Sequence, residues 1–399
     1  MNEIIFAITQ MTACGAERMA ALLCNELSKR GRKVTLIITQ QKNSKSFLEI
    51  LHPQIAVINL EEELRNTKKH SFIPNAIMLR ARGTAKAERV LLHNDNDSYY
   101  IHKYYSRNYD KILWLKQFFV QHKNATIISF MYSSIFHVLL SANRSNKVIL
   151  SERADPKQCL SSRTNQAFFK TMFPKADYVV FQSEGAKEWF ESYANVNGMV
   201  IYNPVRSDLP QPYTGIRNKT VVDFCRLAKQ KNIHLLIDAF ELFWKNHQDY
   251  RLRIIGGWST DGGQEYINQV KKYASESKCF NNIVFLPQSL HIHDDVLKDG
   301  MFVSSSDYEG MSNSMLEAMA IGLPTICTDC PAGGARAVIK DHENGILTPV
   351  GDVEALAYAM CEVADNPELA EKLSYNGTKI RQDLSTDNII IEWMKLIDD

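Results

Sequence analysis

Two glutamates, Glu309 and Glu317, stand eight residues apart in a segment whose other residues are mostly small or apolar. The segment follows an expected strand at 301–305, which begins Met-Phe-Val, and is stopped by the Gly-Leu-Pro of residues 322–324, so a strand, a loop and a helix are predicted. Glu309 would lie in the loop and Glu317 on the helix. Carboxylates accept hydrogen bonds from hydroxyl groups, so one glutamate could hold a sugar and the other a ribose.

The helix of this segment is expected to begin near residues 312 and 313. Main-chain amides at a helix start, aided by the helix dipole, form a site for a diphosphate. The residues that we expect to line this binding loop, together with Glu317, are Gly310, Met311, Ser312, Asn313 and Ser314. The alternative is that Glu309 is a loop charge and Glu317 an exposed helical residue, neither with a function.

The whole phrase resembles the two-glutamate motif of the retaining glycosyltransferases of family 4, including the Glu-Ala-Met-Ala of residues 317–320 and the Gly-Leu-Pro that follows. The resemblance implies an α/β protein with two Rossmann-like doubly wound domains facing a cleft, the GT-B fold. It also implies retaining transfer of a hexose or N-acetylhexosamine without a metal or other cofactor. The second domain would hold most of the nucleotide-sugar donor.

A second resemblance lies at residues 222–232, where an expected strand joins an expected helix. The family has Gly-Arg-Leu there and a lysine soon after, and its arginine and lysine bind the donor diphosphate. Arg226 and Lys231 match that pair, while Cys225 stands where the family has the glycine. Two cations would stabilise the negative charge that develops on the leaving diphosphate. Arg226, Lys231 and Glu309 are therefore the expected catalytic residues.

Two glycine-containing loops also resemble the family. Residues 9–18 resemble its Gly-Gly-Ala-Glu-Arg loop, with Gly15 retained and Cys14 in place of a glycine. This likeness implies that Gly15 lies against the donor and that Glu17 lies at the acceptor or cleft, whereas a plain turn between strand and helix is the alternative. Gly256, after a second-domain strand, resembles the family's turn below the nucleotide.

The Ser-Glu-Arg-Ala-Asp-Pro of residues 151–156 follows another expected strand. It resembles a Ser-Glu-Arg-x-Asp-Pro subgroup often found in bacterial surface-polysaccharide assembly. The likeness implies that Glu152 and Arg153 face the cleft. A salt-bridged structural pair is the alternative.

Strand and helix patterns alternate along the chain, which is typical of parallel sheets with helical crossovers. The expected strands are 3–9, 33–38, 56–60, 125–130, 147–150, 178–182, 199–202, 220–225, 252–255, 283–286, 301–305 and 324–327. The expected helices are 16–30, 233–246, 265–277, 314–321, 353–364 and 388–396.

The 399 residues exceed what one hydrophobic core usually supports, and the prolines after Asn203 mark a linker. We expect an acceptor-binding domain at 1–203, with a basic insertion at about 61–110. A nucleotide-sugar-binding domain is expected at 204–385, and a final helix at 386–399 would pack on the first domain.

The net charge of +1 hides an asymmetry, because residues 1–205 hold 27 Lys and Arg against 17 Asp and Glu, and the remaining residues hold 19 against 28. Seven of the cations lie between Arg65 and Arg89. A solvated basic face is one interpretation, and contact with membrane phospholipid or a diphosphate-bearing acceptor is the other. No apolar run approaches the roughly 18 to 20 residues that cross a bilayer, and no signal peptide is evident, so we expect a cytoplasmic protein that is peripheral at the inner membrane face.

No metal site is expected. Cys327 and Cys330 have CxxC spacing without a second pair or a histidine at zinc spacing. Asp95 and Asp97 resemble a DxD metal motif, but they stand in a polar, insertion-like region.

The expected activity is transfer of a sugar from a UDP-sugar, or a GDP-sugar, to a glycan on a polyprenyl diphosphate, in the synthesis of O-antigen, capsule or exopolysaccharide. UDP is favoured over GDP by the subgroup resemblance alone, and no nucleic acid is expected as a partner. Two rivals remain. One is a GT-B-fold nucleotide-sugar 2-epimerase, which needs no acceptor, and the other is a sugar-nucleotide-binding assembly subunit without activity.

Overall fold

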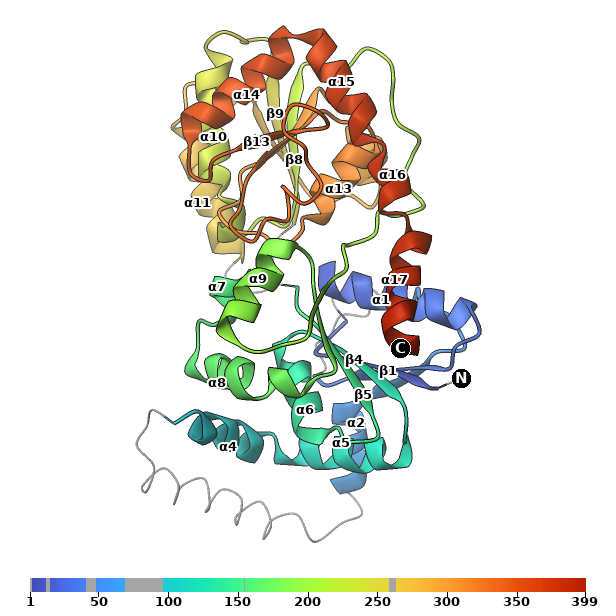
Figure 1. Cartoon of the computed structure of the whole chain (residues 1–399). Helices are drawn as coiled ribbons and strands as arrows, with labels where there is room; N and C mark the ends of the chain where they lie inside the picture. Colours follow the sequence, from blue (N-terminus) through green and yellow to red (C-terminus); the bar gives the residue numbers. More distant parts are fainter. Residues whose placement is uncertain (1, 12–14, 41–47, 69–95, 154, 258–262) are drawn as a thin grey trace. The chain divides into compact units, whose positions relative to one another are not determined.

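The structure is a computed structural model that describes residues 2–11, 15–40, 48–68, 96–153, 155–257 and 263–399. It consists of two compact units, each with its own parallel sheet (Figure 1). The first unit comprises Met1–Gln182, Ala186–Ile201 and Ile390–Asp399, and the second comprises Ser183–Gly185 and Tyr202–Ile389.

Seven parallel strands form the sheet of the first unit, in the order β3-β2-β1-β4-β5-β6-β7. β1, β2 and β4 are buried along their whole length, which explains their unbroken apolar sequences. The strands are β1 (Ile4–Ile8), β2 (Val34–Ile38), β3 (Ala56–Asn59), β4 (Thr126–Phe130), β5 (Lys147–Ser151), β6 (Tyr178–Phe181) and β7 (Gly198–Val200). The helices are α1 (Gly15–Lys29), α2 (Leu60–Lys68), α4 (Asp97–Arg107), α5 (Tyr109–Gln121), α6 (Tyr132–Ser141), α7 (Pro156–Cys159), α8 (Arg163–Thr171) and α9 (Glu184–Tyr193).

Six parallel strands form the sheet of the second unit, in the order β10-β9-β8-β11-β12-β13. They are β8 (Thr220–Phe224), β9 (Arg251–Ile255), β10 (Ile283–Leu286), β11 (Met301–Ser304), β12 (Thr325–Thr328) and β13 (Ile346–Thr348). The helices are α10 (Ile233–Trp244), α11 (Gly263–Ser275), α12 (Ile292–Val296), α13 (Asn313–Ala320), α14 (Val353–Asp365), α15 (Pro367–Gly377), α16 (Ile380–Asp383) and α17 (Thr386–Asp398).

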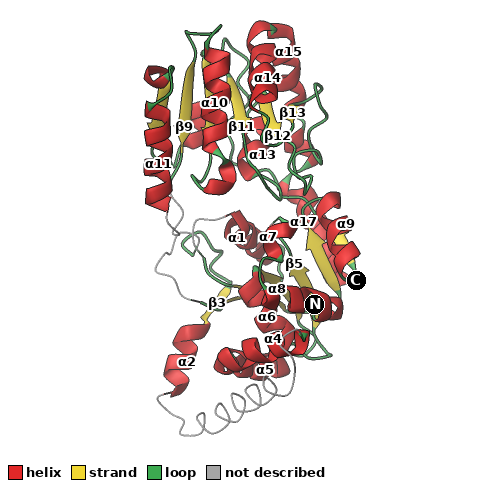
Figure 2. Ribbon diagram, turned by 90° about the vertical axis from the view of Figure 1, so that its left-hand side faces the viewer, coloured by secondary structure: helices red, strands yellow, loops and turns green. Residues whose placement is uncertain are grey.

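Each sheet has a point where the strand order reverses: between β1 and β4 in the first unit, and between β8 and β11 in the second. Because crossovers between parallel strands are right-handed, a reversal places the connecting helices on opposite faces of the sheet. In the second unit α10 and α11 accordingly lie on the face opposite α13 (Figures 1 and 2). Ligands of doubly wound sheets bind beyond the carboxyl ends of the strands at such reversal points.

Helix α17 begins in the second unit and ends in the first, because the division falls after Ile389. Its Trp393 is fully buried in the first unit and stacks on Phe130 of β4 at 6.2 Å between ring centres. The end of the chain therefore contributes a large aromatic side chain to the first core.

The expected α/β fold with two doubly wound domains is confirmed. The twelve expected strands correspond to β1–β12, and the six expected helices correspond to α1, α10, α11, α13, α14 and α17. The elements that were not expected are α2, α4, α5, α6, α7, α8 and α9 of the first unit, and α12, β13, α15 and α16 of the second. β7 is three residues long and begins one residue before the expected strand. Most of the basic segment falls at 69–95, outside the described residues, between α2 and α4. None of the helices in the described ranges is long and apolar enough to cross a membrane.

Candidate functional site

The two strands at the reversal point of the second sheet each lead into a loop that carries predicted site residues. The loop after β8 holds Arg226 and Lys231, and the loop after β11 holds Glu309. Helix α13 follows and carries Glu317. Because β8 and β11 are parallel neighbours, both loops leave the same edge of the sheet.

An ion pair joins these two loops. Nζ of Lys231 lies 2.5 Å from Oε1 of Glu309, and the two side chains are 10% and 18% exposed. The Ser306 hydroxyl donates to the same carboxylate oxygen at 3.4 Å. The predicted diphosphate-binding cation and the predicted sugar-binding carboxylate are thus in direct contact, although 78 residues separate them in the sequence.

Hydrogen bonds hold the loop after β8 against the loop after β11. Asn232 has a φ of 43°, a left-handed conformation that asparagine tolerates, and its side chain donates to Asp307 at 2.7 Å. The main-chain amide of Asp307 donates to the carbonyl of Gln230 at 2.9 Å. The Ser305 hydroxyl donates to the carbonyl of Lys231, also at 2.9 Å. This network fixes the position of Lys231.

Asp223 is a buried carboxyl near this ion pair that the sequence analysis did not single out. It lies on β8 and is 1% exposed. Its Oδ2 accepts a hydrogen bond from the Cys225 thiol at 3.4 Å, and its Oδ1 has no hydrogen-bond partner among the described residues. Burial raises the pKa of Asp223 to about 6, against the opposing effect of Lys231. An acidic residue within an apolar strand is the signal that could have identified it.

The charge on Lys231 is stabilised by its surroundings. Burial alone would lower the pKa of this lysine. The neighbouring Glu309, Cys225 and Asp223 outweigh burial and raise the pKa above its ordinary value. Lys231 therefore remains a cation over the physiological pH range.

Helix α13 begins with a serine cap. Ser312 is the N-cap residue, and its hydroxyl accepts a hydrogen bond from the amide of Met315 at 3.4 Å. The Ser314 hydroxyl lies 3.0 Å from the Ser312 hydroxyl. The helix start is thus formed as the sequence predicts.

Two of the predicted loop residues are held by Asn203, which follows the last strand of the first sheet. The main-chain amide of Asn203 donates to the sulfur of Met311 at 3.4 Å, and its side-chain amide donates to Asn313 at 2.9 Å. Both contacts lie inside the second unit. Met311 and Asn313 therefore have a structural partner in addition to any role toward a ligand.

Glu317 is buried on α13, with 7% of the residue exposed. Its Oε2 lies 2.8 Å from Nε2 of His293 on α12. The alternative that Glu317 is merely an exposed helical residue is therefore wrong. The sequence analysis did not include His293.

Close approaches of main chain require glycine at two positions. A Cβ atom on Gly256 would lie 1.9 Å from the carbonyl oxygen of Cys225, and one on Gly334 would lie 1.5 Å from the carbonyl oxygen of Gly310. Gly256 thus allows the end of β9 to lie against the main chain of the loop after β8. This close approach is present although Cys225 stands in that loop where the family has a glycine. Gly334 brings the loop after β12 against Gly310.

Arg226 is not joined to the Lys231–Glu309 pair by a hydrogen bond or ion pair that the structure describes. It is exposed, and its guanidinium donates to the side chain of Gln230 at 3.4 Å. Gln230 in turn donates to the carbonyl of Tyr308 at 2.8 Å. Arg226 therefore lies in the loop after β8, and Gln230 connects it to the loop after β11, while its charge is open to solvent.

The predicted residues of the first unit lie after β1 and β5. Gly15 begins α1, and Glu17 is buried in its first turn. Glu152 is 5% exposed, and its Oε1 accepts a hydrogen bond from the Tyr132 hydroxyl at 3.2 Å. A position for these residues at the cleft stays a prediction.

Arg153 packs against aromatic rings of the same unit. Its guanidinium lies 5.5 Å from the ring centre of Phe130 and 5.8 Å from that of Trp393. Its Nε donates to the Ser151 hydroxyl at 2.7 Å. Such cation–π contacts stabilise the buried arginine.

The described residues contain no group of three His, Cys, Asp or Glu side chains arranged to hold a metal ion. Cys327 and Cys330 are both buried, and the thiol of Cys330 donates to the carbonyl of Ser306 at 3.2 Å. Of the possible DxD pair, Asp95 lies outside the described residues, and Asp97 begins α4.

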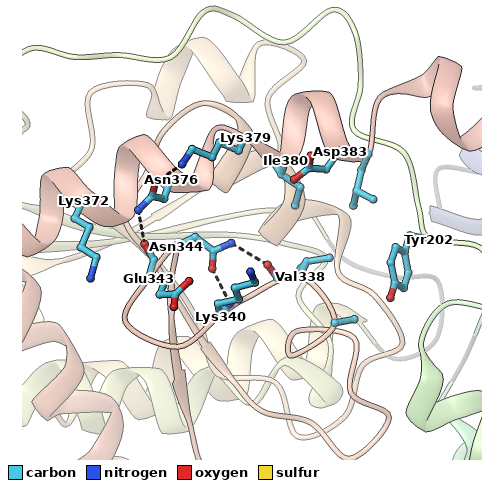
Figure 3. A pocket seen from close by; sticks show the side chains of 12 residues that line it. Tyr202, Val338, Lys340, Glu343, Asn344, Lys372, Asn376, Lys379, Ile380 and Asp383 are labelled. Carbon is cyan, nitrogen blue, oxygen red and sulfur yellow. Dashed lines mark hydrogen bonds between the residues drawn. The ribbon is translucent and has the colours of Figure 1, made fainter.

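A cavity of about 600 Å³ lies elsewhere in the second unit, between the loop before β13 and helices α15 and α16 (Figure 3). Lys340, Lys372 and Lys379 are among its lining residues. Asn376 donates to the carbonyl of Glu343 at 2.9 Å. No predicted donor-binding residue lines this cavity, so it is separate from the loops after β8 and β11.

The two parallel sheets define a protein of the GT-B fold. A solved structure of Anabaena HepE in complex with UDP superposes with a TM-score of 0.76 at 16% identity, covering 99% of both chains. At this level of identity the likeness shows the fold alone.

Residues 216–380 match the family described as glycosyl transferases group 1. The matched segment lies inside the second unit and contains Arg226, Lys231, Glu309 and Glu317. The match supports the family-level resemblance over this segment, which is less than half of the chain.

Curated relatives match parts of the chain. An uncharacterized glycosyltransferase of Haemophilus influenzae is 25% identical over 222 residues, which cover 55% of this chain and 61% of the relative. A poly(glycerol-phosphate) alpha-glucosyltransferase of Bacillus subtilis is 25% identical, covering 54% of this chain and 32% of the relative. The chain thus spans less than two thirds of both relatives.

Proposed function

We propose that this protein is a glycosyltransferase that moves a hexose or N-acetylhexosamine from a nucleotide-diphosphate sugar, with UDP favoured over GDP. The observation that carries the proposal is the partly buried ion pair between Lys231 and Glu309 at the reversal point of the second sheet. It joins two motifs that both lie in the segment matching the glycosyl transferases group 1.

Each site residue has a role in this proposal. Lys231 and Arg226, with the amides at the start of α13, bind the diphosphate. Glu309 accepts hydrogen bonds from the sugar hydroxyls, and Glu317 accepts them from the ribose. The ion pair fits these roles because one cation then contacts both the leaving phosphate and the carboxylate that holds the sugar.

The reaction that we propose retains the anomeric configuration. The bond between the anomeric carbon and the phosphate oxygen breaks as the acceptor oxygen attacks the same face. The acceptor's proton passes to a phosphate oxygen of the leaving nucleotide. Lys231 and Arg226 stabilise the negative charge that develops on the diphosphate, so the transfer needs no metal.

For the acceptor we propose a growing glycan on a polyprenyl diphosphate, at the inner face of the cytoplasmic membrane. The excess of cations in residues 1–205 supports an anionic partner for the first unit. The B. subtilis relative is named a poly(glycerol-phosphate) alpha-glucosyltransferase, and this name gives a polymer as its acceptor. Surface-polysaccharide synthesis, whether of O-antigen, capsule or exopolysaccharide, is the corresponding proposal for this chain.

The test of the proposal is a panel of UDP-sugars and GDP-sugars, each incubated with the protein with and without a lipid-linked acceptor. We expect release of nucleoside diphosphate from one donor, and loss of more than about 100-fold of this activity in Glu309→Ala. Glu354→Ala, which removes an exposed glutamate of α14 in the same unit, is the control and should keep full activity.

Product analysis decides between the proposal and its rivals. A glycosylated acceptor with the donor's anomeric configuration supports it, whereas an inverted linkage contradicts the retaining mechanism. Free sugar changed at carbon 2, formed without acceptor, would identify an epimerase. A Glu309→Ala protein as active as the parent would overturn the role of the ion pair.

A further inference from the structure

A buried hydrogen bond joins helices α12 and α13, between Nε2 of His293 and Oε2 of Glu317 at 2.8 Å. Both side chains are 9% exposed. The mechanism described above uses Glu317 but assigns nothing to His293.

The chemistry of the two groups sets the direction of the bond. A carboxylate only accepts hydrogen bonds, so Nε2 of His293 carries the hydrogen and donates it. The ring of His293 packs edge-on against Phe224 at 6.2 Å between ring centres, with an angle of 85° between the planes. The donor is therefore held in one orientation by the end of β8.

A hydrogen bond of this kind restricts the side-chain rotamers of the glutamate whose carboxylate accepts it. A glutamate side chain loses rotamer entropy when it is fixed, and a neighbour that fixes it beforehand removes this cost from binding. A carboxylate offers about four acceptor positions, so Glu317 can accept from His293 and from vicinal hydroxyls together.

We propose that His293 is a positioning residue, which orients Glu317 toward the ribose hydroxyls and so makes the site specific for ribonucleotides. The inference rests on the proposed function, because it takes the ribose as the partner of Glu317. It adds a specificity-determining contact that acts through Glu317 and does not touch the nucleotide. The competing explanation is that the bond only ties α12 to α13.

The experiment removes the hydrogen bond and the ribose hydroxyls separately. His293→Phe keeps a ring against Phe224 but loses the donor, and His293→Gln keeps an N–H group at a similar distance. His247→Phe is the matched control, because His247 also stacks on a phenylalanine and pairs with a carboxylate, Asp365, in the same unit. Binding of UDP and GDP, and of their 2′,3′-dideoxy forms, is measured by calorimetry on the intact chain.

We expect His293→Phe to bind the ribonucleotide about 10-fold more weakly than the parent, the loss typical of a hydrogen bond to a charged group. Its affinity for the dideoxy form should equal that of the parent. His293→Gln should recover most of the ribonucleotide affinity, and His247→Phe should change neither.

Two results would overturn the inference. One is that His293→Phe loses equal affinity for the ribonucleotide and for its dideoxy form. The other is that His293→Phe melts like the parent and loses affinity for neither form. If His293→Phe does not fold, the comparison rests on His293→Gln, which must then retain the preference for the ribose. Failure of the parent to bind UDP or GDP would instead refute the proposed function itself.

Discussion

At the residue scale, the site depends on how three charged groups, two of them buried and Glu309 partly so, lie close together. Lys231 pairs directly with Glu309, and the buried Asp223 interacts electrostatically with both. If all three groups were ionised, the cluster would carry one negative charge away from water. Burial of that charge is unfavourable, which agrees with the raised pKa of Asp223.

The raised pKa of Asp223 predicts a pH dependence of stability. Its value of about 6 in the folded state exceeds the ordinary 3.8, so the unfolded chain loses this proton first as the pH rises. The free energy of unfolding should therefore fall between about pH 4 and pH 6, by up to about 3 kcal/mol from this group. Denaturant unfolding of Asp223→Asn should lack this part of the pH profile.

The control for this prediction is Asp249→Asn, which removes an exposed carboxylate paired with Lys219. It should leave the pH-dependent loss of stability in place. A profile of Asp223→Asn that matches the parent between pH 4 and pH 6 would show that Asp223 is not the group responsible.

The sequence predicts Lys231, Glu309 and Glu317 as site residues because each matches a residue of a family motif. His293 lies in no such motif, and Asp223, although within residues 222–232, matches none of the residues that the family has there. Both are singled out only by neighbours that the fold brings together. His293 reaches Glu317 across 24 residues. Such contacts cannot be inferred from local spacing in a single sequence.

At the element scale, the loops of the site are held by close main-chain approaches. The loop after β12 reaches the loop after β11 because Gly334 has no side chain. The Gly310 carbonyl occupies the space where a Cβ atom would stand. The shape of the loop before α13 therefore depends on a residue outside the two-glutamate motif.

Gly334→Ala should displace this loop. We expect a loss of about 1 to 3 kcal/mol in the free energy of unfolding, as for other overpacked positions, and weaker nucleotide binding. Gly377→Ala is the control, because a Cβ atom there meets its nearest neighbour at 3.4 Å, an ordinary contact. Thermal melts and UDP titrations of both variants check the prediction, and a Gly334→Ala protein indistinguishable from Gly377→Ala would contradict it.

The strands β1–β12 could be predicted from the sequence because buried parallel strands are continuous apolar runs. The helices of the first unit after α1 were not predicted, although α5 has 13 residues and α4 has 11. In the second unit the missed elements include the short β13, with three residues, and α12, with five. The start of α15 carries a sequence signal for a helix, since Asn366 caps the helix and Pro367 occupies its first turn.

At the scale of the whole molecule, the end of the chain belongs to the first unit although it follows the second. Trp393 of α17 is fully buried there, against Phe130. The chain therefore returns to the first unit after Ile389, having left it before Tyr202.

Trp393→Ala should destabilise the first unit by about 3 to 5 kcal/mol, the usual result of removing a large buried aromatic side chain. Ile391→Ala is the control, because that side chain is 51% exposed on the same helix. Hydrogen exchange of the first-unit strands measures the effect. Unchanged protection of β4 in Trp393→Ala would show that α17 contributes little to that core.

The central claim is that Lys231 binds the diphosphate of the donor. The measurement that tests it most directly is calorimetric binding of UDP and of uridine to Lys231→Met combined with Glu309→Gln, which removes both charges of the buried pair. Glu309→Gln alone and Lys229→Met, from the same turn as Lys231, are the comparisons.

We expect the double variant to bind UDP at least about 10-fold more weakly than Glu309→Gln, since a charge-assisted contact to phosphate is lost. Uridine, which has no phosphate, should bind all four proteins equally, and Lys229→Met should bind UDP like the parent. Equal affinity of the double variant and Glu309→Gln for UDP would contradict the account.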